Sequence, residues 1–136
     1  MNTKTIIGGV FGGIAFFFLG WLIFGIVLGP MTASYTNMSC MRPEAELSVS
    51  LLAVANLLWG LTFAYIFSKM PSITGFASAA VQGAIISILI GLSYDLFMYI
   101  FSTMSNSLVP AIYNVVGNAV LGAIGGGVIG WWMGRK

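Results

Sequence analysis

The amino-acid sequence predicts an all-α, polytopic membrane protein with four transmembrane helices in an antiparallel bundle. Of its 136 residues, 59% are hydrophobic and only 6% are charged, and the mean hydropathy is +1.01. A soluble domain carries about 25% charged residues, so five Lys or Arg and three Asp or Glu are too few to cover a water-facing surface. The apolar stretches reach the roughly 20 residues that a helix needs to cross a bilayer. They are too long and too uniformly apolar for transmembrane β-strands.

The four expected spans form a single transmembrane domain over residues 1–136. They cover approximately residues 5–29, 47–68, 74–101 and 108–133. Each is separated from the next by a short segment that contains proline or polar residues.

Prolines mark the expected helix boundaries. We expect Gly29-Pro30 to end the first helix, because proline cannot continue the hydrogen-bond ladder. Residues 42–46 are expected to begin the second helix, with Glu44 and Glu46 near its positive N-terminal dipole. Pro71-Ser72 and Pro110 are expected to open the third and fourth helices, the latter with caps from Ser105, Asn106 and Ser107.

The distribution of basic residues predicts that both termini are cytoplasmic. With four spans, the termini and the loop near residue 70 share one side of the membrane, which holds Lys4, Lys69, Arg135 and Lys136. The opposite side holds one basic residue, Arg42, and the single cysteine, Cys40. Cytoplasmic loops carry the excess of Lys and Arg, so we expect a multi-pass protein of the cell inner (plasma) membrane with Cys40 outside.

Glycines four residues apart in the first and last spans predict close helix packing. The residues are Gly8, Gly9, Gly12 and Gly13 in the first span and Gly122, Gly126, Gly130 and Gly134 in the last. Small residues at this spacing allow helix backbones to approach closely in a membrane. We expect the two glycine faces to meet within the chain, with a remaining face for oligomerisation. The alternative is a glycine-lined interface between subunits.

Four polar residues are expected to converge in the outer half of the bundle: Asp95, Asn114, Asn118 and Asn56. Intramembrane polar groups either join helices or form functional sites. In the structural interpretation, which we prefer, these groups stabilise the bundle, and Asp95 is protonated or pairs with Arg42. In the functional interpretation, Asp95 binds a proton or cation and the asparagine amides coordinate a substrate.

The residue inventory argues against several other functions. The chain has no His and one Cys, which excludes an internal disulfide, His/Cys metal sites and most nucleophile–base pairs. We therefore expect no enzymatic activity, catalytic residue, metal or cofactor, and a net charge of +2 gives no reason to expect nucleic acid. We expect Phe16, Phe17 and Phe18 to face lipid, and Trp59 to serve in packing or in the interfacial belt.

The layout of Gly20-Trp21 followed by Gly29-Pro30 resembles small four-helix bacterial inner-membrane proteins of unknown function. The resemblance extends over the whole chain and implies a fold but no activity. We expect a structural, assembly or accessory-subunit role, as a homo-oligomer or part of a membrane complex. The alternatives are an oligomeric proton- or cation-linked transporter or channel that uses Asp95, and a lipid-interacting protein. A transporter requires Asp95 to line a cavity, whereas a scaffold buries it against partners.

Overall fold

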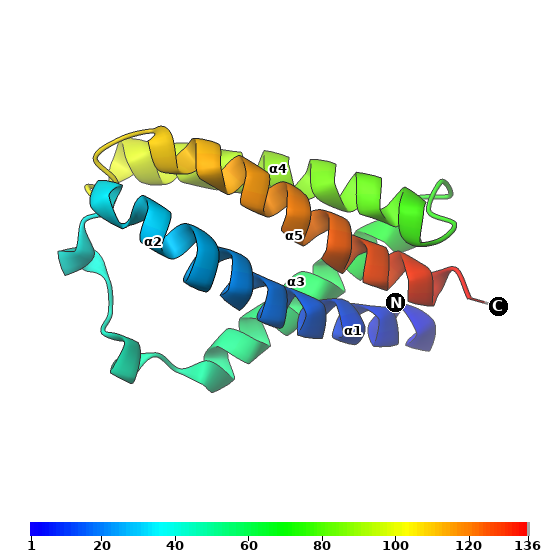
Figure 1. Cartoon of the computed structure of the whole chain (residues 1–136). Helices are drawn as coiled ribbons and strands as arrows, with labels where there is room; N and C mark the ends of the chain where they lie inside the picture. Colours follow the sequence, from blue (N-terminus) through cyan, green and yellow to red (C-terminus); the bar gives the residue numbers. More distant parts are fainter. Residues whose placement is uncertain (136) are drawn as a thin grey trace.

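In a computed structural model, which describes residues 1–135, the chain forms long apolar helices joined by short loops (Figure 1). In chain order the elements are α1 (Thr3–Gly20), the π-helical η1 (Trp21–Val27), α2 (Leu28–Thr32), the 3-10 turns η2 (Ala33–Tyr35), η3 (Met38–Cys40) and η4 (Glu44–Glu46), α3 (Val49–Ser68), α4 (Phe76–Phe101) and α5 (Val109–Met133). Four helical stretches in this part of the chain are long and apolar enough to cross a membrane: Thr3–Tyr35, Val49–Ser68, Phe76–Phe101 and Val109–Met133. The all-α class and the four spans agree with the sequence prediction, and the helix composition is that of a multi-pass membrane protein in contact with lipid.

The loops lie at two opposite ends of the molecule. The termini and the turn between α3 and α4 lie at one end, which we call the terminal end (Figure 1). The loops before α3 and α5 lie at the other, the loop end, where the Asn37 N–H donates to the Met104 carbonyl (2.6 Å) and the Asn106 N–H to the Tyr35 carbonyl (3.0 Å). These bonds join two loops far apart in sequence. The side of the membrane that each end faces stays a prediction.

The first span continues through Gly29-Pro30, so the expected end of the helix there was wrong. Proline is accommodated because η1 precedes it: the Leu28 N–H donates to the Ile23 carbonyl, five residues back instead of four. Local π-helical turns allow proline inside membrane helices, because the freed backbone groups find other partners. The helix therefore runs on to Thr32.

The second long helix begins at Val49, later than the expected start within residues 42–46. Ser48 caps it, with its Oγ accepting a hydrogen bond from the Leu51 N–H at 3.3 Å. The two glutamates form the separate turn η4 instead. They therefore do not complement the dipole of α3, and that explanation of them was wrong.

The starts of α4 and α5 differ in how well the sequence predicted them. Pro71 does not open α4, which begins at Phe76. In the first turn of this helix the Ser78 Oγ accepts hydrogen bonds from the Thr74 and Gly75 N–H groups, which lie just before it (2.9 and 3.2 Å). Pro110 does lie in the first turn of α5, as expected. A serine side chain, which can satisfy free N–H groups, was a better marker of the start of α4 than proline.

Helices α4 and α5 pack along two matching rows of residues spaced four apart. The α5 row is Gly134, Gly130, Gly126, Gly122, Asn118 and Asn114, and the row that faces it begins at Gly75 and continues through Ala79, Gly83, Ser87, Gly91 and Asp95 on α4. A Cβ added at Gly126 would lie 2.9 Å from the Ala79 carbonyl oxygen and 3.0 Å from the Gly83 Cα. The row of Gly122, Gly126, Gly130 and Gly134 therefore faces α4 and the residues just before it, and the expectation that this row faces the first span was wrong.

The glycines of α1 divide between two partners. A Cβ at Gly9 would lie 2.9 Å from the Leu61 Cα and one at Gly13 would lie 2.7 Å from the Leu57 Cα, both on α3. Gly8 and Gly12 instead face Met133 and Ile129 of α5. The first and last spans therefore do meet, but through large side chains of α5 and not through its glycine row.

The buried core lies where all four long helices meet, toward the terminal end. It consists of Phe16, Phe63, Ala64, Phe67, Ala79 and Ile129. Phe16 is 2% exposed and its ring centroid lies 5.1 Å from that of Phe63, so the expectation that it faces lipid was wrong. Beyond this core α3 moves away from its neighbours toward the loop end (Figure 1), where Val49 and Leu51 are 64% and 70% exposed.

Candidate functional site

A hydrogen-bonded pair of polar side chains lies on the α4–α5 interface near the loop end. The Asn114 Nδ2 donates to both carboxylate oxygens of Asp95, at 3.2 Å to Oδ1 and 3.1 Å to Oδ2. The pair forms because both residues lie on the facing rows, one helical turn beyond the Gly91–Asn118 contact. The close approach of the helices at their glycines therefore fixes the position of the carboxylate.

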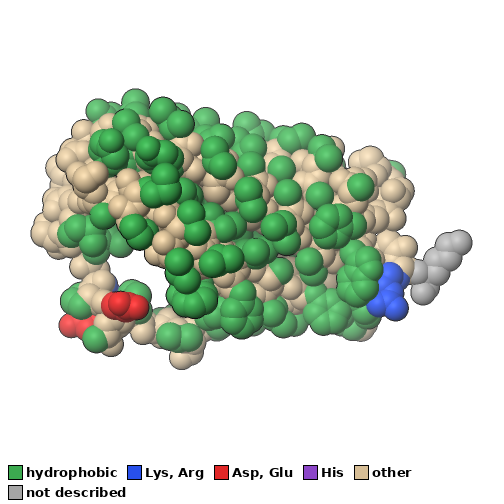
Figure 2. All heavy atoms as spheres, viewed as in Figure 1, with side chains coloured by type: hydrophobic (Ala, Val, Ile, Leu, Met, Phe, Trp, Pro, Cys, Tyr) green, Lys and Arg blue, Asp and Glu red, His purple; other side chains and the backbone are tan. Residues whose placement is uncertain are grey.

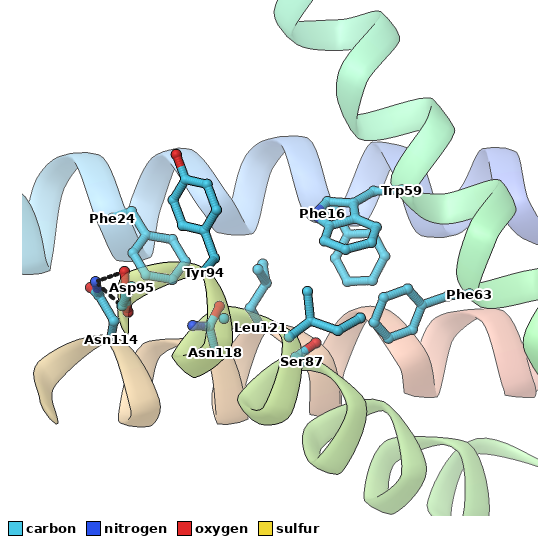
Figure 3. Close-up of a pocket in the computed structure, with 12 residues that line it drawn as sticks. Phe16, Phe24, Trp59, Phe63, Ser87, Tyr94, Asp95, Asn114, Asn118 and Leu121 are labelled. Carbon is cyan, nitrogen blue, oxygen red and sulfur yellow. Dashed lines mark hydrogen bonds between the residues drawn. The ribbon is translucent and has the colours of Figure 1, made fainter. Parts of the chain in front are cut away.

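The Asp95–Asn114 pair lies on the wall of a cavity of about 550 Å³ that is lined by residues of all four spans. Phe16 and Phe24 come from the first span, Trp59 and Phe63 from α3, and Leu121 from α5. Figure 3 shows Phe16, Trp59 and Phe63 across the cavity from the carboxylate, with Leu121 between, whereas the rings of Phe24 and Tyr94 lie beside Asp95. This arrangement of apolar walls with a few fixed polar groups is typical of small-molecule sites, whose volumes are about 300–1,000 Å³.

The cavity exists because α3 diverges from α4. The two helices share core contacts near Phe67 and Ala79, and they separate toward the loop end (Figure 1). Trp59 and Tyr94, which line the cavity from these two helices, are 40% and 61% exposed. The cavity therefore opens sideways between α3 and α4, toward the surface that lipid contacts.

A second, smaller cavity of about 130 Å³ lies on the loop-end side of the same pair. Tyr94, Asp95 and Asn114 line both cavities, so the pair stands between them. The hydroxyl-bearing residues of the smaller cavity include Thr32, Thr36, Tyr99, Ser105 and Ser107. The carboxylate therefore borders a cavity with several hydroxyl groups on one side and the largely apolar cavity on the other.

The structure brings three of the four predicted site residues together. Asn118 lines the large cavity one helical turn further along α5 than Asn114 (Figure 3). Asn56 does not line it, and its Nδ2 donates at 2.8 Å to the Leu52 carbonyl of its own helix. The expected convergence of Asn56 was wrong because the divergence of α3 carries this residue away from α4.

The alternative pairing of Asp95 with Arg42 does not occur. Arg42 lies near Glu46 instead, with Nη1 and Oε2 4.0 Å apart and both side chains exposed. Across residues 1–135 this is the one ion pair, so the Asp95 carboxylate has an amide but no Lys or Arg partner.

The sequence interpretation missed the aromatic residues that line the cavity and the row of α4 residues that faces α5. Phe16, Trp59 and Phe63 carry no distinctive signal, because aromatic residues are common in every span. The row on α4 did carry one: Ala79, Gly83, Ser87, Gly91 and Asp95 repeat at the same four-residue spacing as the α5 row. Alignment of these two rows end to end would have paired Asp95 with Asn114.

Within the described residues, no group of three or more His, Cys, Asp or Glu side chains is arranged to hold a metal ion. No family model, curated protein or solved structure matches the chain. The four long apolar helices indicate a small polytopic membrane protein without identifying a family, and the functional argument depends on the cavity.

Proposed function

We propose that this multi-pass membrane protein binds a small amphipathic cation, with its charged group at Asp95 and its apolar part in the large cavity. The observation that carries the proposal is the position of a carboxylate, without a basic partner among residues 1–135, on the wall of a cavity of about 550 Å³. Intramembrane acids of this kind mark ion and substrate pathways. A scaffold, by contrast, would enclose the acid against packed neighbours.

The chemistry of the cavity selects the ligand class. The amide of Asn114 occupies one side of the carboxylate, and a cationic or N–H-bearing ligand group would satisfy the other. Aromatic faces of Phe16, Trp59 and Phe63 attract cations as well as apolar surface. The residues that line the cavity supply one carboxylate and no basic side chain, so no acid–base pair supports an enzymatic role.

The smaller cavity supports the further step of transport. Because Asp95 and Asn114 line both cavities, this pair is placed to exchange a ligand or proton between the large cavity and the loop end. We therefore favour a cation-linked carrier of the cell inner membrane over a static binding protein. This is one of the alternatives that the sequence left open.

The test uses tetraphenylphosphonium, a lipophilic cation, as the probe. We expect saturable binding to the wild-type chain in lipid nanodiscs and at least about tenfold weaker binding to Asp95→Asn, because the Coulombic attraction between the cation and the carboxylate is lost. Glu44→Gln removes the same charge from an exposed turn and is expected to bind as the wild type does. Equal binding by Asp95→Asn and wild type, with both folded, would contradict the proposal.

Proteoliposomes distinguish a carrier from a binding protein. A carrier that uses Asp95 is expected to take up the cation when a pH gradient is imposed across the liposome membrane to drive the uptake. Asp95→Asn is expected to abolish this uptake. Binding without uptake would restrict the function to ligand capture.

Assembly is a second candidate, favoured by the first half of α3. Val49, Leu51 and Val54 are at least half exposed on the part of α3 that diverges from the other helices (Figure 1). A partner helix would cover this surface. In a Cys40→Ser background, Leu51→Cys is expected to form a disulfide-linked dimer if a second copy is that partner, whereas Ile112→Cys, an exposed control on α5, is not.

A further inference from the structure

An apolar groove with a cationic end lies between α1 and α5, far from the Asp95 cavity. It has a volume of about 400 Å³, and its lining includes Phe11, Ala15 and Phe18 from α1 and Trp131, Trp132 and Arg135 from the end of α5. We call it the α1–α5 groove. It lies at the terminal end, where Figure 2 shows basic side chains beside hydrophobic ones.

The cationic end of the groove is held in place by aromatic contacts. The Arg135 guanidinium lies 5.0 Å from the Trp131 ring centroid and 5.5 Å from that of Trp132. Trp132 is itself fixed, since its Nε1 donates to the Lys4 carbonyl at 3.1 Å and its ring packs edge-on against Phe11 at 5.0 Å. The guanidinium is exposed and makes no ion pair among residues 1–135. Among the described residues no acid competes for its donors, so they can bind an anion.

The two parts of the groove match the two parts of a phospholipid. Phe11, Ala15 and Phe18 extend from the level of Trp132 toward the interior of the span, so an acyl chain in the groove would lie along α1. A guanidinium binds phosphate through two parallel hydrogen bonds, and basic sites between transmembrane helices select anionic headgroups. Tryptophan is the side chain that most favours the headgroup level of a bilayer.

We infer that the α1–α5 groove binds an anionic phospholipid, with its phosphate on Arg135 and one acyl chain along Phe11, Ala15 and Phe18. The site is independent of the proposed cation site, because the two cavities share no lining residue. The lipid would brace the α1–α5 contact at the terminal end.

The test compares phosphatidylglycerol with phosphatidylcholine of identical acyl chains. Binding to the detergent-purified chain is measured by native mass spectrometry and by the shift in Tm on lipid addition. We expect phosphatidylglycerol to bind at least about fivefold tighter, the selectivity that one basic residue near an anionic surface provides. Arg135→Gln is expected to abolish this preference. Lys69→Gln removes a charge at the same end but outside the groove, and is expected to retain it.

A second variant tests the acyl-chain part. Ala15→Trp fills the groove and leaves Arg135 in place, so it is expected to weaken both lipids. Retention of the phosphatidylglycerol preference by Arg135→Gln, or wild-type binding of both lipids by Ala15→Trp, would overturn the inference. Neither variant touches Asp95, so failure here leaves the tetraphenylphosphonium result unaffected.

Discussion

The interface between α4 and α5 is packed to backbone contact at the terminal end, whereas at the loop end the same two helices carry polar side chains beside a cavity. We call the half of the interface at the terminal end the tight half and the half at the loop end the open half, and both use the same four-residue spacing. In the tight half the facing positions are glycine, alanine or serine, such as Gly83 opposite Gly122 and Gly126. In the open half they are Asp95 and Asn114, joined by hydrogen bonds. The size and polarity of one residue per turn therefore decide whether the two helices pack to backbone contact or carry a polar pair beside a cavity.

This difference also explains how a carboxylate is held in a fixed place inside a membrane span. Lipid gives no hydrophobic force between helices, so close packing and interhelical hydrogen bonds must hold them together. The glycine half supplies the packing and aligns α4 with α5. The polar half then needs one amide to orient Asp95, and the cavity beside it stays open because α3 packs on α1 instead.

The largest effect is expected from a substitution in the tight half. In Gly122→Leu the new side chain would meet the Gly83 carbonyl oxygen and Ser87, and a helix backbone cannot move aside without separating the pair. We expect a loss of unfolding free energy of more than about 3 kcal/mol, measured by denaturation with sodium dodecyl sulfate in mixed micelles. Gly20→Leu is the matched control, because no atom lies within 4 Å of its added Cβ. Equal stability of the two variants would refute the backbone contact.

A smaller loss is expected in the open half. Asp95→Leu leaves the Asn114 amide without its partner and is expected to cost about 1.5 kcal/mol, near the upper end for hydrogen bonds between membrane helices. Asp95→Asn can still accept a hydrogen bond from Asn114, so it is expected to cost less than Asp95→Leu in the same assay. An Asp95→Leu variant as stable as the wild type would show that the pair does not contribute to folding.

The sequence predicted the parts of the molecule that depend on local pattern. The four spans follow from hydropathy, and the Asp95–Asn114 contact was within reach because an intramembrane polar group needs a partner. It did not predict the continuation of the helix past Pro30, which depends on the wider π-helical turn before it. The sequence also did not predict that Asn56 lies outside the site, because the direction of α3 depends on the packing of Gly60 against α1. Helix direction is a property of tertiary contacts, and the cavity depends on it.

Adding volume to the open half should be tolerated where adding it to the tight half is not. Leu121 precedes Gly122 in the chain, but its side chain points into the large cavity (Figure 3). We expect Leu121→Phe to change the unfolding free energy by less than about 1 kcal/mol, because the added atoms enter unfilled space. The same variant is expected to weaken tetraphenylphosphonium binding. Destabilisation comparable to that of Gly122→Leu would show that the cavity closes in the membrane.

The smallest perturbation tests which side of the membrane each end of the interface faces. Cys40 is the single cysteine and is exposed in the loop end, so a membrane-impermeant maleimide is expected to label it in intact cells. Ser72→Cys in a Cys40→Ser background lies in the turn at the terminal end and is expected to react only after the membrane is permeabilised. Neither substitution touches the α4–α5 rows, so stability should not change. Reversed labelling would place the terminal end outside. It would also place the α1–α5 groove outside the cytoplasmic leaflet, whose anionic lipids are the ligands that we propose for Arg135.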